Sequence, residues 1–247
     1  MKVLSIDLDY ITGPTAELFS GLWHDVNPII RWKELYDNTD FNESHLTIDT
    51  GGLIYCYHLF LKSLKNNPKV VFGYEHDAIL YELQNHNNID IVNIDHHDDV
   101  MHGSYNEMMQ RGNAQQALDK EYEDICKYNH VNEGNWGAWL HQKEKLNSFV
   151  WIANKESGNL DRNWYNEKLL GDKYQTYFRQ DYKFEDYNFD YVFVCLSPQY
   201  TPQHHWHYFT MFMMAYEEMT GKEIELISKT KYMFEDLFTQ TTDYITK

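Results

Sequence analysis

The amino-acid sequence predicts an α/β protein: a single three-layer α/β/α domain over residues 1–247, with a mainly parallel central sheet. Short apolar runs alternate with segments of helical spacing along the chain. Two runs, at residues 149–153 and 191–196, are apolar on successive residues, which is typical of strands covered on both faces. No linker rich in Gly, Ser or Pro interrupts this alternation, and strand–helix alternation favours one parallel sheet with helices on both sides.

The elements follow from local patterns in order along the chain. Apolar and β-branched runs predict strands, and apolar residues at helical spacing predict helices. Pro14 begins one helix, and Asn66, Asn67 and Pro68 end another. The predicted strands are residues 3–8, 69–73, 89–94, 149–153, 191–196 and 223–227. The predicted helices begin at Pro14 or span residues 53–61, 76–84, 208–219 and 231–238.

Composition excludes several classes of partner. The formal charge of -17 repels phosphate backbones and anionic lipid, so we expect no nucleic acid and no membrane as partners. Such a charge favours a cationic substrate or metal ions, or it provides solubility alone. Three separated cysteines with no CxxC pair indicate reduced thiols, and Asp7 and Asp9 interrupt any signal-peptide run. We therefore expect a cytoplasmic protein; the oligomeric state is not predicted.

Three segments place metal-ligating side chains at the ends of predicted strands. Asp7 and Asp9 alternate along the first strand, so we expect both on one side. His76 follows the strand at 69–73, where the chain turns into a helix. Asp95, His97 and Asp99 follow the strand at 89–94 at alternate positions. Because the carboxyl ends of parallel strands meet at one edge of the sheet, we expect these side chains to converge.

Carboxylates packed together repel one another unless cations are present. Carboxylate-rich sites with some imidazole suit Mn²⁺, and six ligands suffice for two metals that share a water. A structural reading remains open for the isolated acids and for His76, which can begin a helix. The run Asp95-His96-His97-Asp98-Asp99 after a buried strand is harder to explain structurally. We expect two divalent ions, Mn²⁺ in the first place, held by Asp7, Asp9, His76, Asp95, His97 and Asp99.

These motifs resemble those of the ureohydrolase superfamily, which contains arginase and agmatinase and has histone deacetylases as relatives. Asp95-x-His97-x-Asp99 resembles its D-x-H-x-D motif, Ser5-x-Asp7-x-Asp9 its S-x-D-x-D motif, and the turn at 73–77 its G-G-D-H-S turn. Here S-x-D-x-D comes first rather than last, which implies an arginase-like fold that is circularly permuted. Glu75 stands where that turn has Asp, and Cys195 stands where the family has an acid.

The resemblance is nearest to a diverged branch that includes peptide arginases. It implies a cytoplasmic enzyme that hydrolyses arginine residues of a ribosomally made precursor peptide to ornithine and urea. The partner would be that arginine-containing peptide. Gly134-Asn135-Trp136 resembles a loop of the family. The candidate catalytic residues are Asp99, Glu75 and His141, and the candidate substrate-binding residues are Glu133, Asn135 and Trp136.

Alternatives remain open at several of these positions. Glu75 and Glu133 are both candidates to hold the guanidinium group, and His102, His141 and the His204–His205 pair are candidate proton donors. Aromatic side chains line a peptide groove or belong to the core: Trp136, Trp139, Tyr200 and Trp206. The alternative functions are an agmatinase-like or deacetylase-like hydrolase, and a metal-dependent binding protein without catalysis.

Overall fold

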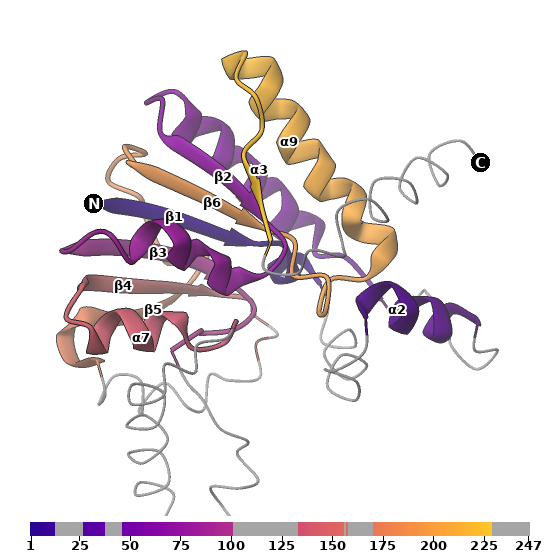
Figure 1. The fold of residues 1–247 in the computed structure, drawn as a ribbon, viewed down its shortest axis with the longest axis horizontal. Helices are drawn as coiled ribbons and strands as arrows, with labels where there is room; N and C mark the ends of the chain where they lie inside the picture. The colour runs from indigo at the N-terminus through magenta and orange to yellow at the C-terminus, as the bar shows by residue number, and fades with distance from the viewer. Residues whose placement is uncertain (13–26, 38–45, 101–132, 156, 158–169, 229–247) are drawn as a thin grey trace, which may run out of the picture.

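The computed structural model describes residues 1–12, 27–37, 46–100, 133–155, 157 and 170–228. The helices expected from Pro14 and over residues 231–238 lie outside these residues, as do His102 and Cys126. The expected α/β/α fold is confirmed. Seven strands form one parallel sheet in the order β5-β4-β3-β1-β6-β2-β7 (Figure 1). The strands are β1 (Lys2–Asp7), β2 (Lys69–Gly73), β3 (Ile89–Asp95), β4 (Leu146–Ala153), β5 (Tyr174–Phe178), β6 (Tyr191–Cys195) and β7 (Leu226–Ile227).

The N-terminal strand β1 lies at the centre of the sheet, between β3 and β6. Its partners are aligned so that Ile6 lies opposite Ile94 of β3 and Asp7 lies opposite Cys195 of β6. On the far side of β6, Gly73 of β2 is also paired with Cys195. Four strands that are far apart in sequence therefore end side by side, and the loops that follow them meet at one edge.

Helices cover both faces of the sheet. Helices α3 (Thr50–Leu64) and α9 (Trp206–Thr220) contact one another along one face, as Figure 1 shows. The core on this face includes Leu4 and Ile6 of β1. Val3, on the opposite face, packs in a second core with α7 (Trp136–Gln142) and the short helices η3 (His76–Ile79) and α4 (Leu80–Leu83). The remaining helices are η1 (Leu8–Ile11), α2 (Pro28–Asp37), η5 (Gly171–Lys173) and η6 (Gln203–His205).

Alternation along the strands decides which face the polar residues of the site take. Val3 belongs to the α7 face and Leu4 to the α3–α9 face, so Ser5 and Asp7 fall on the α7 face. On β3, Ile91 belongs to the α7 face, so Asn93 and Asp95 share that side. The two strands thus present a serine, an asparagine and two carboxylates to one side of the sheet edge.

Two predicted elements differ from the structure. The helix expected over residues 76–84 is a 3₁₀ turn, η3, followed by the single turn α4, because the Leu80 amide still bonds to carbonyls two and three residues back. The strand expected over 223–227 is reduced to Leu226–Ile227, because it pairs at the sheet edge only with Phe72 and Gly73. Cys56 and Cys195 are free and buried. Within the described ranges, no helix combines the length and apolar character that crossing a bilayer would need.

Candidate metal centre

Three strand ends deliver the central residues of the site. Asp7 is the last residue of β1, Asp95 is the last residue of β3, and His76 begins η3 three residues after β2 ends. All three are buried, with at most 2% of their surface exposed. The sequence prediction that these segments converge is confirmed for these residues.

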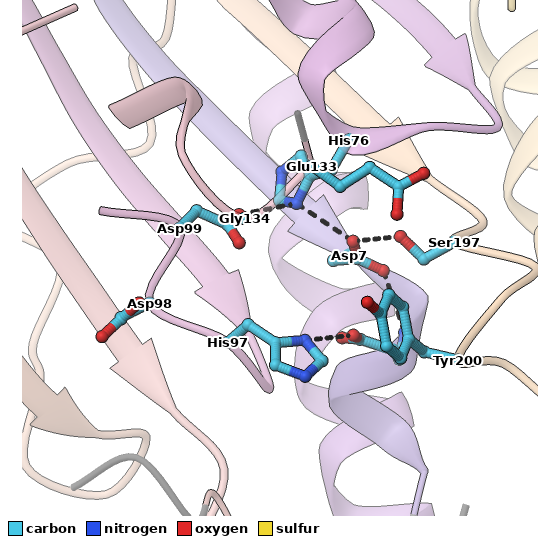
Figure 2. Close-up of a pocket in the computed structure, with 10 residues that line it drawn as sticks. Asp7, His76, His97, Asp98, Asp99, Glu133, Gly134, Ser197 and Tyr200 are labelled. Atoms are coloured by element: carbon cyan, nitrogen blue, oxygen red, sulfur yellow. Dashed lines mark hydrogen bonds and ion pairs between the residues drawn. The ribbon is translucent and has the colours of Figure 1, made fainter. Parts of the chain in front are cut away.

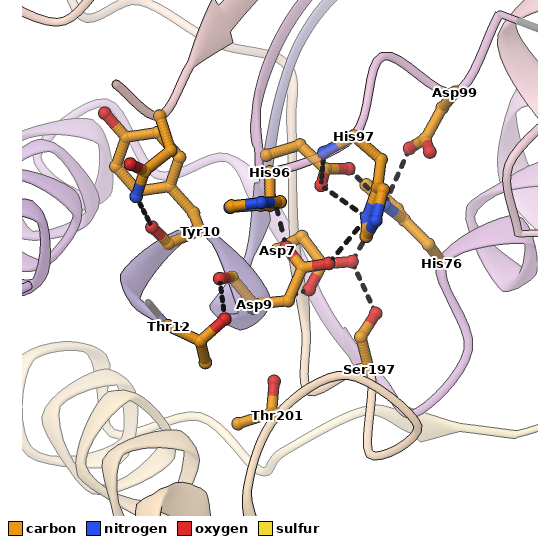
Figure 3. A network of polar contacts seen from close by, with 12 residues as sticks. Asp7, Asp9, Tyr10, Thr12, His76, His96, His97, Asp99, Ser197 and Thr201 are labelled. Atoms are coloured by element: carbon orange, nitrogen blue, oxygen red, sulfur yellow. Dashed lines mark hydrogen bonds and ion pairs between the residues drawn. The ribbon is translucent and has the colours of Figure 1, made fainter. Parts of the chain in front are cut away.

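His76 lies at the centre of the cluster (Figure 3). Its Nδ1 is 3.0 Å from Asp7 Oδ2, 2.9 Å from Asp95 Oδ2 and 2.9 Å from Asp99 Oδ2. The other ring nitrogen, Nε2, is 2.6 Å from the Ser5 hydroxyl, and this contact holds the orientation of the ring. The ring also stacks on Phe193, with centroids 6.0 Å apart.

One ring nitrogen carries at most one proton, so Nδ1 cannot donate to three carboxylates at once. The three distances have another meaning. Adjacent ligand atoms of an octahedral cation, each about 2.1 Å from it, are about 3.0 Å apart. With Nε2–H donating to Ser5, the Nδ1 lone pair would face the same point as the carboxylates, as metal-binding histidines do. The arrangement therefore fits a cation among these atoms.

Asp9 and His97 form the second part of the cluster. His97 Nδ1 lies 2.8 Å from Asp9 Oδ2, and the backbone amide of His97 donates to Asp95 Oδ1 at 2.8 Å. The expectation that Asp9 continues the alternation of the first strand is wrong. The strand ends at Asp7, whose side chain accepts the amide of Asp9 and starts η1. This turn, rather than strand alternation, brings the second carboxylate back to the site.

Asp99 is held by residues of two other elements. Its Oδ2 accepts the Trp136 indole N–H at 2.8 Å and an Asn93 amide N–H at 3.4 Å. The backbone of Asp99 has a positive φ of 54°, which Asp tolerates better than most residues, and its carbonyl accepts the Gly137 amide. This turn directs the carboxylate toward His76.

Gly73 permits the close approach of β2 to β6 just before His76. A Cβ at this position would lie 2.4 Å from the Phe193 ring, the same ring on which His76 stacks. The glycine of the motif is therefore required by packing at the strand end.

Ser197 is a member of the site that the sequence did not reveal. It follows β6, has a positive φ of 45°, and its hydroxyl donates to Asp7 Oδ2. The Ser5 and Asn93 roles were likewise not assigned, although a pattern exists for both. Each polar residue stands two positions before a strand-end aspartate and has apolar residues directly before and after it. No comparable pattern marks Ser197, because a loop conformation positions it.

Burial and mutual repulsion shift the acidity of the cluster. Burial raises the pKa of Asp9 to about 8, with further raising by Asp7 and Asp95. Burial also raises the pKa of Asp95 to about 7, together with Asp99 and Asp7. His76 has its pKa well above the usual range because the nearby aspartates outweigh burial. The pKa of Asp7 is lowered because contacts with His76 and Ser197 outweigh its burial. A cation bound among these groups would lower the pKa values of the carboxylates, so that all of them would be ionised.

A cavity of about 110 Å³ opens beside the cluster (Figure 2). Burial raises the pKa of Glu133 to about 8, with Asp77 and Asp7 adding to it. Burial raises the pKa of Tyr200 to about 12, so its phenol is neutral at pH 7. The Tyr200 ring lies 4.8 Å from the His97 ring. The cavity is lined by Asp7, Asp9, His76, His97, Asp98, Asp99, Glu133, Gly134, Ser197 and Tyr200.

Four of the candidate catalytic and substrate-binding residues stand outside this cavity lining: Glu75, His141, Asn135 and Trp136. Glu75 is buried, and its Oε1 accepts a hydrogen bond from Ser228. His141 lies in the last turn of α7, about 8 Å along the helix axis from Trp136. Asn135 is buried and precedes α7 as its N-cap residue. Neither Glu75 nor His141 is among the residues that line the cavity.

The aromatic candidates divide between cavity and core. Tyr200 lines the cavity, whereas Trp136 and Trp206 are buried in the core and Trp139 packs against the core, partly buried. Trp136 therefore positions Asp99 through its indole rather than offering a face to substrate. Trp206 donates to the Thr201 carbonyl and so anchors the turn that carries Tyr200.

The histidine pair also lies outside the cavity lining. His204 Nδ1 is 2.8 Å from the Tyr36 hydroxyl. Burial lowers the pKa of His205 to about 3, with His204 and His207 adding to the effect, which makes His205 a poor proton donor.

In the part of the chain that the structure describes, two groups of Asp and His side chains, buried except for His97, could hold a metal ion: Asp7, His76 and Asp95, and Asp9, Asp95 and His97. In each group the ligand atoms lie within 4.8 Å of one another. No protein-family model, no curated protein and no solved structure matches this chain significantly. The resemblance to ureohydrolases therefore rests on the motifs alone, and function has to be argued from the site.

Proposed function

We propose that this protein is a manganese-dependent peptide arginase that converts arginine residues of a ribosomally made precursor peptide to ornithine, with release of urea. One observation carries the proposal. Asp95 belongs to both ligand groups, and the cavity beside those groups is lined by an acid, Glu133, whose pKa is raised to about 8 by desolvation and by neighbouring acids. The first feature favours a pair of cations, and the second favours a cationic group on the substrate.

The two oxygens of Asp95 serve different neighbours. Oδ2 lies 2.9 Å from His76 Nδ1, and Oδ1 lies 3.8 Å from His97 Nδ1. A carboxylate with one oxygen directed to each of two ligand groups is suited to bridge two ions. The donor set has only oxygen and imidazole nitrogen, which favours Mn²⁺ over the softer metals that thiolates select.

The proposed reaction also requires a binding site for the guanidinium group of the substrate. Glu133 shares the cavity with Asp7 and His76, and its raised pKa reflects burial among other acids. An incoming guanidinium would lower that pKa and donate two parallel hydrogen bonds to the carboxylate. The net charge of -17 adds long-range attraction for a cationic peptide.

The residues of the chain then have separate tasks. The six ligands Asp7, Asp9, His76, Asp95, His97 and Asp99 would hold the metals, which when bound lower the pKa of water to near neutrality. Ser5 keeps the His76 ring in one orientation, and Trp136 and Asn93 fix the Asp99 carboxylate. Asp99 is the residue that would orient the attacking water. Tyr200 supplies a neutral hydroxyl at the cavity wall for the substrate amine.

The direct test is mass spectrometry of an arginine-containing peptide incubated with Mn²⁺-loaded protein. Counting atoms, conversion of arginine to ornithine removes about 42 mass units, and urea appears in equal amount. Asp95→Asn should abolish turnover without loss of fold, because it removes a repelling buried charge. Asp172→Asn, at an exposed position in η5, is the matched control and should keep full activity.

Other outcomes identify the alternatives. Release of acetate from an acetylated amine would indicate a deacetylase-like hydrolase. Urea from agmatine but not from peptides would indicate an agmatinase-like enzyme. Full activity in Asp95→Asn would contradict the site itself, whereas peptide binding without any change of mass would indicate a binding protein.

A further inference from the structure

Arg31 is a buried cation in the helix beside the site. It lies in the first turn of α2 and is only 2% exposed. The next residue, Trp32, is fully buried, and its indole donates to the Pro198 carbonyl at 2.8 Å. Pro198 belongs to the loop after β6 that carries Ser197 and Tyr200. The residue next to Arg31 therefore fastens helix α2 to the loop that contributes Ser197 and Tyr200 to the cavity lining.

The guanidinium group of Arg31 has no hydrogen-bond acceptor in the described part of the chain. None of its three nitrogens, Nε, Nη1 and Nη2, has a partner. The guanidinium group lies over the Trp32 ring, whose centroid is 5.1 Å from Cζ. A guanidinium has five N–H donors, and burying them unpaired is costly. Buried charges in proteins are normally paired, so the missing acceptors point to a ligand.

The electrostatic neighbours of Arg31 place it near the cavity. Burial lowers the pKa of Arg31, while Tyr200 and Glu133 act in the opposite direction. Both of these residues line the cavity that contains the metal ligands. Neither makes a hydrogen bond to the guanidinium. Arg31 does not itself line the cavity, but two residues that do, Tyr200 and Glu133, are the described residues whose charges act on its guanidinium group.

We infer that Arg31 is a substrate-binding residue that pairs with a carboxylate of the substrate. Two parallel N–H donors match the two oxygens of a carboxylate. A singly charged carboxylate also suits the position better than a phosphate, because the acids that line the cavity repel a second negative charge more strongly. The carboxylate comes from the arginine itself, when it is the C-terminal residue, or from an acidic neighbour in the peptide.

This inference rests on the proposed function, because it supplies the second end of a substrate whose cationic end lies at the metal ligands. It makes a specificity prediction that the proposed function alone does not make. Arginine followed by a free carboxylate, or by an acidic residue, should be preferred over arginine in a neutral context.

The test uses ligands that cannot be hydrolysed. Isothermal titration calorimetry on Mn²⁺-loaded protein compares Nα-acetyllysine with its carboxamide, and acetyl-Lys-Asp-amide with acetyl-Lys-Asn-amide. Each pair keeps a cationic end and differs in one carboxylate. We expect one carboxylate ligand to bind at least about tenfold more tightly than its neutral partner, as a charge-assisted pair should. The pair that shows the preference identifies the source of the carboxylate.

The variants connect this preference to Arg31. Arg31→Met should abolish the preference and keep the affinity for the neutral ligands, while Arg31→Lys should retain part of it. Thermal unfolding checks that both variants fold, and removal of an unpaired buried charge should not lower the melting temperature. Equal affinities within both pairs in the wild-type protein, or a preference that persists in Arg31→Met, would overturn the inference. Because lysine ligands release no urea, this result is independent of whether arginine peptides are hydrolysed.

Discussion

The substitution Ser5→Ala tests the metal centre without removing any ligand. The Ser5 hydroxyl lies 2.6 Å from His76 Nε2, and Ser5 is fully buried on the central strand. This contact orients the ring so that Nδ1 faces Asp7, Asp95 and Asp99. Loss of such an outer contact lowers metal affinity about 10–100-fold, or about 1.4–2.7 kcal/mol.

The assay is calorimetric titration of Mn²⁺ into metal-free wild-type and variant proteins at fixed pH. Ser63→Ala is the matched control, because Ser63 is also fully buried and its hydroxyl makes one hydrogen bond, to the Phe60 carbonyl in α3. Both substitutions should lower the free energy of unfolding by about 1 kcal/mol. Only Ser5→Ala should weaken Mn²⁺ binding. Wild-type affinity in Ser5→Ala, or equal weakening in both variants, would refute the assignment of His76 Nδ1 as a ligand atom.

Three further predictions concern the surroundings of the cluster. Trp136→Phe removes the N–H donor on Asp99 Oδ2 and should lower the free energy of unfolding by about 1–3 kcal/mol, measured by urea denaturation; an unchanged value would contradict the indole's role. The metal-free protein should lose thermal stability as the pH rises from 5 to 9, because Asp9 and Asp95, with pKa values of about 8 and 7, keep in the folded state protons that the unfolded chain releases near pH 4. Mn²⁺ should reverse this pH dependence, since it binds the deprotonated groups. If the melting temperature of the metal-free protein instead rises with pH, Asp9 and Asp95 do not have the raised pKa values given above. Gly73→Ala should destabilise the fold by about 1–3 kcal/mol, because its Cβ would lie 2.4 Å from a phenylalanine ring; a wild-type urea midpoint would show that the ring moves freely.

The parallel sheet was predictable because its strands are short, apolar and separated by helical patterns. The same reasoning failed where the pairing partner decides the length of an element. Only two residues at the end of the expected strand 223–227 find a partner, since β7 lies at the edge of the sheet. Propensity along the chain does not contain that information.

The candidate site shows a similar division. Asp7 and Asp95 were predictable because each ends a buried strand, and parallel strands end together. Asp9 was expected for the wrong reason, since a turn stabilised by the Asp7 side chain places it. Ser197 could not be found from sequence, because its role depends on a left-handed loop residue and on the pairing of β6 with β1. Contacts between distant segments follow from topology, which single-sequence patterns do not reveal.

The central place of the first strand has a consequence for biosynthesis. The backbone amide of Lys2 donates a hydrogen bond to Asp190 Oδ2 across a sequence separation of 188 residues. At about 5–20 residues per second, a ribosome needs roughly 10–40 s to make that length of chain. During this interval the apolar N-terminal strand emerges without its β6 neighbour, so nascent chains should recruit chaperones, and truncation before Tyr191 should yield aggregated protein rather than a smaller folded unit.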